Sequence, residues 1–125
     1  MAPLLDHAAA AGVAVVNGSP YQAGLLAGID IETAAKNHGN SPDFQRARQI
    51  YAWCAERDIE VGALAVQFSL RERRIGATLV GPRTLAELEA NIRHATAPLP
   101  EGVWQELDTF LDGLQPAPEA GGEVL

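Results

Sequence analysis

Residues able to bind a ligand gather in the turn NGSPYQAG (residues 17–24), which directly follows the apolar run GVAVV (12–16). Turn residues after a β-branched run are typical of the end of a buried strand. Ser19 and Gln22 can donate hydrogen bonds, and Gly18 and Gly24 let a ligand approach the backbone closely. The spacing alone favours an ordinary turn, in which Gly and Pro only direct the chain. The stretch offers no obvious nucleophile, base or metal ligand.

A second candidate segment, GPRTLAELEAN (residues 81–91), follows another apolar run and opens a helix. Free backbone N–H groups and the helix dipole at such a start face whatever binds there. Thr84 and Glu87 have the spacing of a capping box, so Thr84 is predicted to cap the helix, and it can also touch a ligand. Arg83 and Asn91 are candidate binding residues, with a solvated surface position as the alternative for both.

Other reactive side chains are few. The single cysteine, Cys54, lies in the apolar helical run IYAWCA and is predicted to be a buried, inert thiol. The three histidines are too scattered to suggest a metal site, and His94 is predicted to be a last-turn residue favoured by the helix dipole. Trp53 and Trp104 lie in apolar helical patterns and are predicted to be packing residues.

The composition is that of one globular domain with a modest core: 125 residues, 47% hydrophobic and 20% charged. A net charge of −7 and a single lysine argue against nucleic acid or an anionic membrane as partner. The basic cluster Arg71, Arg73 and Arg74 is interpreted as a solvated helix end rather than a phosphate patch. No apolar run is long enough for a membrane span and the first residues lack a basic secretory start, so we expect a cytoplasmic protein.

These segments must be positioned by alternating helices and strands. The patterns predict helices at 3–11, 41–54, 61–73, 84–95 and 101–111, strands at 13–16 and 75–80, a long loop at 18–41 and a disordered tail at 115–125. This order predicts an α/β fold in which the two strands are parallel. The apolar pattern of both strands is typical of strands that other elements cover on both faces. Two strands alone do not form an independent sheet.

The sequence resembles the aldo-keto reductases, most closely the bacterial D-threo-aldose, L-fucose and pyridoxal dehydrogenase branch. Four segments carry the resemblance in order: LLDHAAAAGVAVV, SPYQAGLLAG, CAERDIEVGALAVQFSLRERRIGATLVGPRT and LAELEANI. The implied fold is a (β/α)₈ TIM barrel, which needs roughly 250 residues. The resemblance implies that residues 1–114 are a C-terminal portion of such a barrel, incomplete by itself, with strands seven and eight and their helices.

The resemblance also implies hydride transfer between a nicotinamide and a carbonyl or hydroxyl carbon of a small carbonyl or sugar substrate. The family's proton donor is a Tyr assisted by Lys, Asp and His after strands one to four. Tyr21 and Lys36 match none of these positions, so no catalytic residue and no metal ligand is assigned. Phosphates bind at the loops after strands seven and eight. The implied cofactor-binding residues are Ser19, Tyr21, Gln22, Gly24, Gly81, Arg83, Thr84, Glu87 and Asn91.

NAD is the expected cofactor, with NADP as the alternative. Many NADP-using relatives carry a basic residue four positions before the Asn that matches Asn91, and Glu87 stands there in this chain. A carboxylate repels a 2′-phosphate and can accept a hydrogen bond from a free ribose hydroxyl, although Arg83 acts in the opposite direction. The alternative function is a non-enzymatic remnant that serves as an interaction or regulatory module. Exposed barrel edges are also expected to allow self-association.

Overall fold

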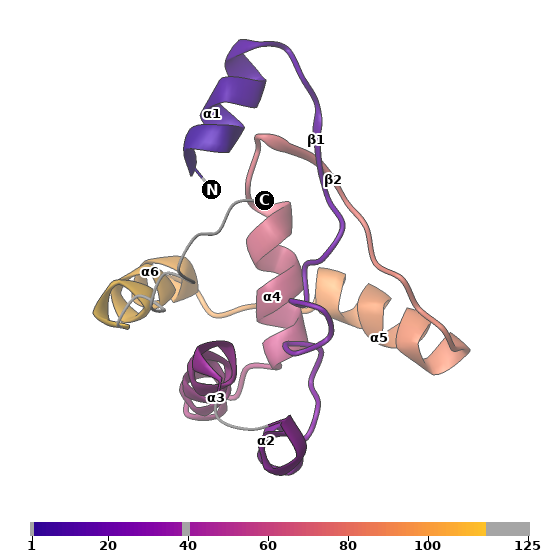
Figure 1. Cartoon of the computed structure of the whole chain (residues 1–125), viewed down its shortest axis with the longest axis vertical. Coiled ribbons are helices and arrows are strands. Elements are labelled where there is room, and N and C mark those ends of the chain that lie inside the picture. Colours follow the sequence, from indigo (N-terminus) through magenta and orange to yellow (C-terminus); the bar gives the residue numbers. More distant parts are fainter. Residues whose placement is uncertain (1, 39–40, 115–125) are drawn as a thin grey trace.

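The structure is a computed structural model that describes residues 2–38 and 41–114 (Figure 1). The elements in chain order are α1 (Ala2–Ala10), β1 (Val15–Asn17), α2 (Ile31–His38), α3 (Pro42–Ala55), α4 (Val61–Leu70), β2 (Ile75–Thr78), α5 (Leu85–Thr96) and α6 (Val103–Gly113). The predicted order of helices and strands is confirmed, apart from the addition of α2. The predicted tail lies outside the described residues.

The expectation of one long loop over residues 18–41 was wrong, because α2 occupies its second half. Asp30 caps this helix: its Oδ1 accepts the backbone N–H of Thr33 at 3.1 Å, and its Oδ2 accepts the Thr33 hydroxyl at 2.6 Å. Glu32 then accepts two hydrogen bonds from the Arg48 guanidinium of α3, at 2.9 and 3.0 Å. The loop after β1 is therefore shorter than predicted, and α2 follows its C-terminal end.

Two predicted caps are confirmed. α3 begins after Ser41, whose Oγ accepts the Phe44 N–H at 3.3 Å, and Pro42 occupies the first turn. α5 begins after Thr84, whose Oγ1 accepts the Glu87 N–H at 3.1 Å. Both side chains satisfy a backbone donor that the helix itself leaves without an acceptor.

The two strands form a parallel pair, as predicted, with Val15 opposite Ile75 and Asn17 opposite Thr78. Helix α4 packs against β2. The ends of both strands are tied to α4 through Ser69, whose hydroxyl lies 2.8 Å from Asn17 Nδ2 and 2.7 Å from Thr78 Oγ1. This polar junction fixes where the loops after the two strands begin.

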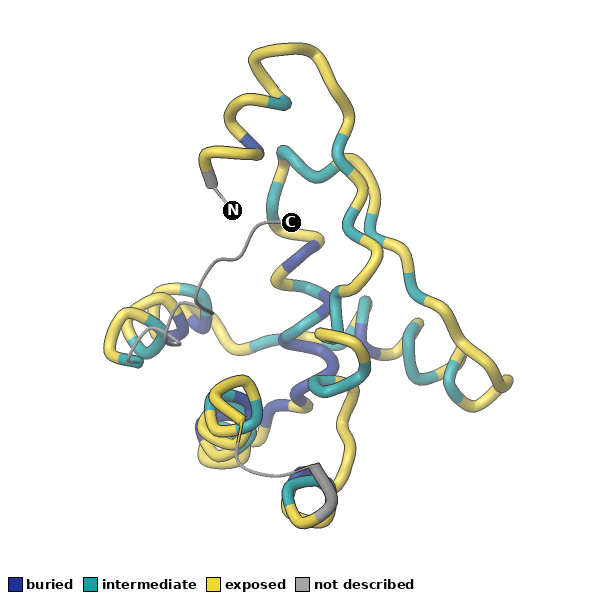
Figure 2. The backbone as a smooth tube through the Cα atoms, viewed as in Figure 1, coloured by how far each residue is buried: buried dark blue, intermediate teal, exposed yellow. Residues whose placement is uncertain are grey.

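The core lies among three helices rather than at the sheet, and Figure 2 shows buried residues concentrated on α3, α4 and α6. Trp53 of α3 is buried as predicted and stacks on Phe110 of α6, with ring centroids 5.6 Å apart. Trp104 lies beside Phe68 and Arg71. The buried cluster consists of Trp53, Cys54, Ile59, Val61, Leu64, Val103 and Leu107.

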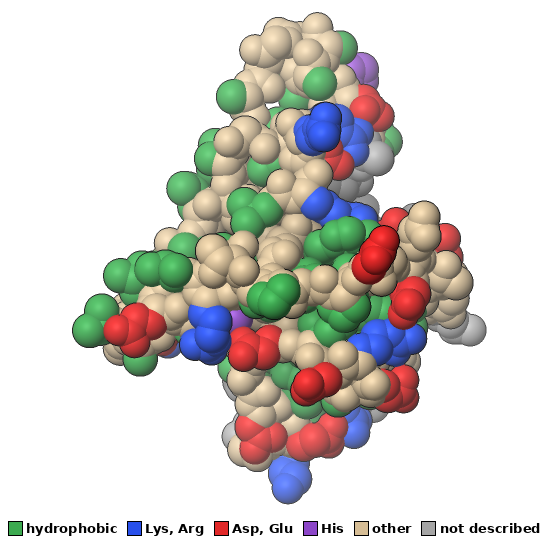
Figure 3. All heavy atoms as spheres, turned by 180° about the vertical axis from the view of Figure 1, so that it is seen from behind, with side chains coloured by type: hydrophobic (Ala, Val, Ile, Leu, Met, Phe, Trp, Pro, Cys, Tyr) green, Lys and Arg blue, Asp and Glu red, His purple; other side chains and the backbone are tan. Residues whose placement is uncertain are grey.

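Large apolar side chains are exposed on the strands and on α5. The apolar pattern of the strands predicts that both of their faces are covered. Within the described residues this is wrong, because Val16 is 55% exposed. Seen from behind, the arm formed by the strands and α5 carries many green side chains, while charged groups gather on the opposite side and over the lower helical part (Figure 3). The exposed set on this arm is Val13, Val16, Leu79, Leu85, Leu88 and Ile92.

Candidate functional site

A cleft of about 440 Å³ lies between the loop after β1 and the segment that joins β2 to α5. Its size is in the range of small-molecule sites. The structure places seven of the nine sequence-predicted residues on its walls: Ser19, Tyr21, Gly24, Gly81, Arg83, Glu87 and Asn91. Gln22 and Thr84 are not among the lining residues. The two candidate segments, separated by more than fifty residues in sequence, therefore face one cavity.

Short local hydrogen bonds shape the loop after β1. Asn17 Oδ1 accepts the Ser19 N–H at 3.1 Å, and Ser19 Oγ accepts the Ala23 N–H at 3.0 Å. Gln22, Ala23 and Gly24 have φ values of 51°, 54° and 89°. Such left-handed backbone is easy for Gly and unusual for other residues. The Ser19 hydroxyl keeps its own hydrogen, which is free to donate toward the cleft.

The far end of this loop is held by Tyr51 of α3. Its hydroxyl accepts the N–H groups of Gly28 and Ile29 at 3.1 and 3.0 Å, and donates to the Leu25 carbonyl at 3.0 Å. Burial raises the pKa of Tyr51, so the hydroxyl keeps the proton that it donates. The loop is thus attached to the core at both ends, and sequence reasoning did not identify Tyr51 as its anchor.

Tyr21 connects the two walls of the cleft. Its hydroxyl lies 2.8 Å from Asn91 Oδ1 and 3.0 Å from His94 Nδ1. The rings of Tyr21 and His94 meet edge to face, with centroids 5.8 Å apart. Burial raises the pKa of the Tyr21 phenol. Tyr21 is therefore a neutral structural link between the loop and α5.

The prediction for His94 was incomplete. The residue lies in the last part of α5, but it is 5% exposed and its Nε2 lies 3.1 Å from Glu60 Oε2. Its ring fills the space beside Gly62, where a Cβ would lie only 2.5 Å from Nδ1. The one sequence signal for this role is the spacing of Asn91 and His94, since residues three apart share a helix face.

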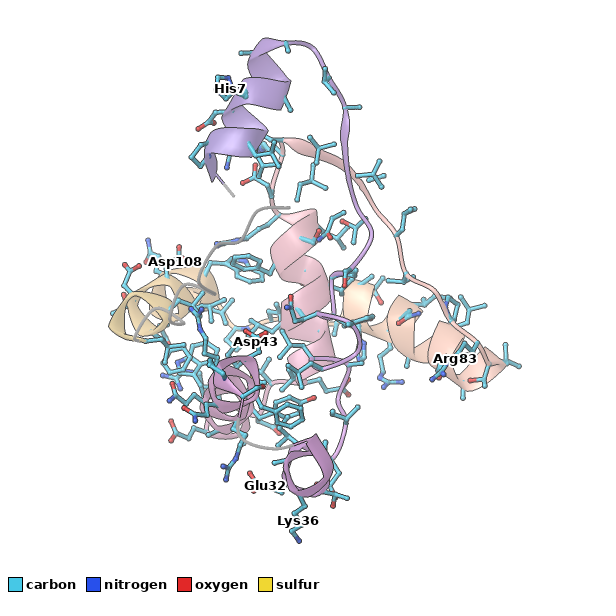
Figure 4. All side chains as sticks on the ribbon, viewed as in Figure 1. His7, Glu32, Lys36, Asp43, Arg83 and Asp108 are labelled. Atoms are coloured by element: carbon cyan, nitrogen blue, oxygen red, sulfur yellow. The ribbon has the colours of Figure 1, made fainter. Side chains whose placement is uncertain are left out.

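The start of α5 forms the second wall. Glu87 Oε2 accepts the backbone N–H of Arg83 at 2.6 Å, and Oε1 lies 3.4 Å from the Arg83 guanidinium. These contacts, led by the Arg83 N–H, lower the pKa of Glu87. In this capping box the Glu87 carboxylate therefore accepts the backbone N–H of Arg83, and not the N–H of Thr84. The Arg83 side chain is 87% exposed and lies just before the start of α5 (Figure 4).

The ionisable side chains that line the cleft are Tyr21, Arg83, Glu87 and His94. Lys36 projects from α2, far from Arg83 in Figure 4, and does not line the cleft beside Tyr21. Burial raises the pKa of Cys54 to about 11, which fits the predicted inert thiol. No group of three His, Cys, Asp or Glu side chains suited to a metal ion occurs in the described part of the chain.

Two arginines of the basic cluster at the end of α4, Arg71 and Arg74, make internal contacts. The Arg71 guanidinium pairs with Asp108 at 3.1 Å and lies over the rings of Phe68 and Trp104. Arg74 pairs with Glu72 and Asp6, both at 2.6 Å. Both guanidinium groups are thus paired with carboxylates of the chain itself, while Arg73 is exposed. Among the described helices, none has the length and apolar character required to cross a membrane.

The chain belongs to the aldo/keto reductase family, whose model matches residues 2–112. It is 31% identical over 96 residues to D-threo-aldose 1-dehydrogenase of Pseudomonas sp, a match that covers 74% of this chain and 29% of that protein. It is 30% identical over 94 residues to L-galactose dehydrogenase of Arabidopsis thaliana, covering 74% of this chain and 28% of that protein. The match thus spans less than a third of the length of either relative. The predicted family resemblance is confirmed.

Proposed function

We propose that the cleft binds the adenosine and phosphate part of NAD(P) in an oxidoreductase that acts on small sugars, aldehydes or alcohols. The observation that carries this proposal is the convergence of the two segments on one cavity, with Ser19 on one wall and Arg83 and Asn91 on the other. Membership of a family of nicotinamide-dependent enzymes supports the choice of ligand. The names of the two relatives support the class of substrate.

The proposed contacts follow from the chemistry of each wall. Arg83 is exposed at the start of α5, where a guanidinium can bind a phosphate through charged hydrogen bonds. The Ser19 hydroxyl and the backbone beside Gly24 take the other side of the phosphates. Asn91 keeps one end of its amide for the adenine edge while the other end contacts Tyr21. Gln22 and Thr84 then act by shaping the loop and capping the helix.

NAD is the proposed cofactor in preference to NADP. Glu87 keeps its negative charge, because its contacts with Arg83 lower its pKa. A carboxylate at this wall disfavours a 2′-phosphate and accepts a hydrogen bond from a free hydroxyl. The same contacts engage the Arg83 backbone N–H and bring the guanidinium within 3.4 Å of the carboxylate, which reduces the counteracting effect of Arg83.

β1 and β2 are proposed to correspond to strands seven and eight of a (β/α)₈ barrel. Their parallel pairing and the cleft beyond their carboxyl ends support this assignment, since barrel enzymes bind phosphates there. Under this assignment the catalytic Tyr, Lys, Asp and His belong to other strands of a whole barrel. The 125-residue chain by itself is then proposed to bind the nucleotide without catalysing hydride transfer.

Binding of ADP-ribose to the full chain tests this function, because ADP-ribose carries the adenosine and diphosphate without the nicotinamide. We expect isothermal titration calorimetry to detect binding, and Arg83→Ala to weaken it about tenfold through the loss of one charged contact. Arg73→Ala is the matched control, since Arg73 is exposed and does not line the cleft. Absence of binding, or equal losses in the two variants, contradicts the proposal.

A second candidate is an interaction module, which the exposed apolar side chains of the strands and α5 favour. Leu85 and Ile92 are 70% and 58% exposed and lie two turns apart on one helix. This candidate predicts self-association at micromolar concentration that is lost in a Leu85→Glu, Ile92→Glu double variant. Light scattering that shows a monomer for the unmodified chain contradicts it.

A further inference from the structure

The hydroxyl of Tyr21 has one hydrogen and two neighbours that compete for it. Asn91 Oδ1 lies 2.8 Å from this hydroxyl, and His94 Nδ1 lies 3.0 Å from it on the other side. The opposite ring nitrogen of His94, Nε2, faces a carboxylate oxygen of Glu60 at 3.1 Å. The protonation of His94 therefore decides the direction of the two hydrogen bonds that Tyr21 makes, with His94 and with Asn91.

With His94 protonated, both ring nitrogens donate, Nε2 to Glu60 and Nδ1 to Tyr21. Tyr21 then donates its hydrogen to Asn91 Oδ1, which leaves the Asn91 NH₂ group for the cleft. With His94 neutral, the Glu60 carboxylate keeps the remaining hydrogen on Nε2, so Nδ1 accepts from Tyr21. Tyr21 can now only accept from Asn91, whose amide turns by half a rotation and leaves its oxygen for the cleft.

We propose that His94 is a positioning residue of the cleft, whose protonation sets whether Asn91 offers a hydrogen-bond donor or an acceptor to a bound base. The proposal rests on the proposed function only for the identity of the ligand. Asn91 lines the cleft together with Tyr21 and His94, so all three groups lie at the wall where the base would bind. A rearrangement confined to one side-chain amide is sufficient, because its oxygen and nitrogen exchange places without any backbone movement.

The groups around His94 favour the neutral form. Burial lowers its pKa, and the charge of Arg93 acts in the same direction, while the Glu60 carboxylate opposes both. On α4, the residue that packs against the imidazole ring of His94 is Gly62, which carries no charge. Gln67 of the same helix donates to the backbone carbonyl of His94 at 2.8 Å. The orientation in the structure, with Asn91 Oδ1 accepting from Tyr21, is that of the protonated form. At neutral pH we expect the turned amide, with its oxygen toward the cleft, and acidification restores the orientation with the NH₂ group toward the cleft.

The relative affinity for adenine and hypoxanthine nucleotides distinguishes the two orientations of the Asn91 amide. Adenine carries an amino donor at the position where hypoxanthine carries a carbonyl acceptor, whereas the ribose and phosphates of ADP and IDP are the same. The Asn91 oxygen favours adenine, and the NH₂ group favours hypoxanthine. Because the phosphates ionise alike in both ligands, the ratio of the two dissociation constants isolates the base contact. We expect this ratio to change about tenfold in favour of IDP as His94 becomes protonated, equivalent to about 1.4 kcal/mol.

The first test needs neither a ligand nor a variant. In the full chain labelled with ¹⁵N at His and Asn, NMR reports the protonation of His94 and the environment of the Asn91 side-chain amide across pH 5–8. We expect the Asn91 amide signals to shift with the same midpoint as His94, while the signals of Asn17 do not. Asn91 signals that ignore the His94 titration overturn the proposal.

The second test measures Kd for ADP and IDP in the unmodified chain, in His94→Asn and in the control His7→Asn. Asn places an amide near the position of Nδ1 but does not titrate, and His7 is an exposed histidine of α1. We expect a pH-dependent ADP/IDP ratio in the unmodified chain and in the control, and a constant ratio in His94→Asn. A constant ratio in the unmodified chain overturns the proposal. If neither nucleotide binds while Asn91 follows His94 in the NMR titration, the proposed function fails and the coupling of the two residues stands.

Discussion

Gly62→Ala places a methyl group where the His94 ring lies. The added Cβ would stand closest to Cε1 and lie 2.5 Å from Nδ1, whereas ordinary contacts begin at 3.4 Å, so the ring must move by at least about 0.9 Å. A movement of that size misaligns the hydrogen bonds of His94 with Tyr21 and Glu60. Overpacking typically costs about 2 kcal/mol and a lost hydrogen bond about 1 kcal/mol. The better helix propensity of Ala returns up to about 1 kcal/mol, which leaves a net loss of about 2 kcal/mol.

Urea denaturation followed by tryptophan fluorescence measures this loss. Gly113→Ala is the matched control, because Gly113 also lies in a helix and a Cβ there meets nothing within 4 Å. We expect Gly113→Ala to be neutral or slightly stabilising. Replacing His94 with Ala in the Gly62→Ala background should recover part of the lost stability, since the clash is removed. If Gly62→Ala is as stable as Gly113→Ala, the packing and hydrogen bonding assigned to His94 are refuted.

Three further predictions concern pH, the buried thiol and the cofactor. Folding lowers the pKa of His94, so at mildly acidic pH the unfolded chain binds a proton that the folded chain does not. The stability of the chain should therefore fall as the pH drops below about 6.5. In thermal melts, His94→Asn should lack the part of this pH dependence that His94 causes. Cys54 is buried with a pKa raised to about 11, so a thiol reagent at pH 8 should label it only as fast as the chain unfolds, and rapid labelling of the folded chain would contradict its burial. Glu87→Arg should shift the ratio of Kd values for NAD and NADP about tenfold toward NADP, and a parent that already favours NADP would overturn the preference inferred from Glu87.

Local features were predictable from the sequence because they depend on residues close together in the chain. Ser41 and Thr84 cap helices through bonds to backbone groups three residues away. The burial of Cys54 and Trp53 follows from apolar residues at helical spacing. Helix α2 was missed although Asp30 and Thr33 carry a capping pattern, because the short helix is rich in polar residues and lies within a glycine-containing stretch.

The candidate site was predictable only in part. The resemblance to a family selected the two segments, and the structure brings them to one cleft. Their connection depends on Tyr21 reaching Asn91 and His94, which lie 70 and 73 residues further along the chain. No periodic pattern encodes such a contact. The role of Gly62 is similarly non-local, because its missing side chain is required only by the ring of a residue on another helix.

The most direct test of the proposed nucleotide site is an NMR titration of the ¹⁵N-labelled full chain with ADP-ribose. Binding in the cleft predicts that the backbone amide signals of residues 18–24 and 81–87, apart from the two prolines, shift together with the side chain of Asn91 and saturate at one Kd. Backbone amide signals of Asp58, Ile59, Ala63, Ala97 and Leu99, which line a separate pocket near the start of α4, should stay in place. Shifts confined to that second pocket, or no saturable shift at millimolar ADP-ribose, would contradict the assignment of the cleft.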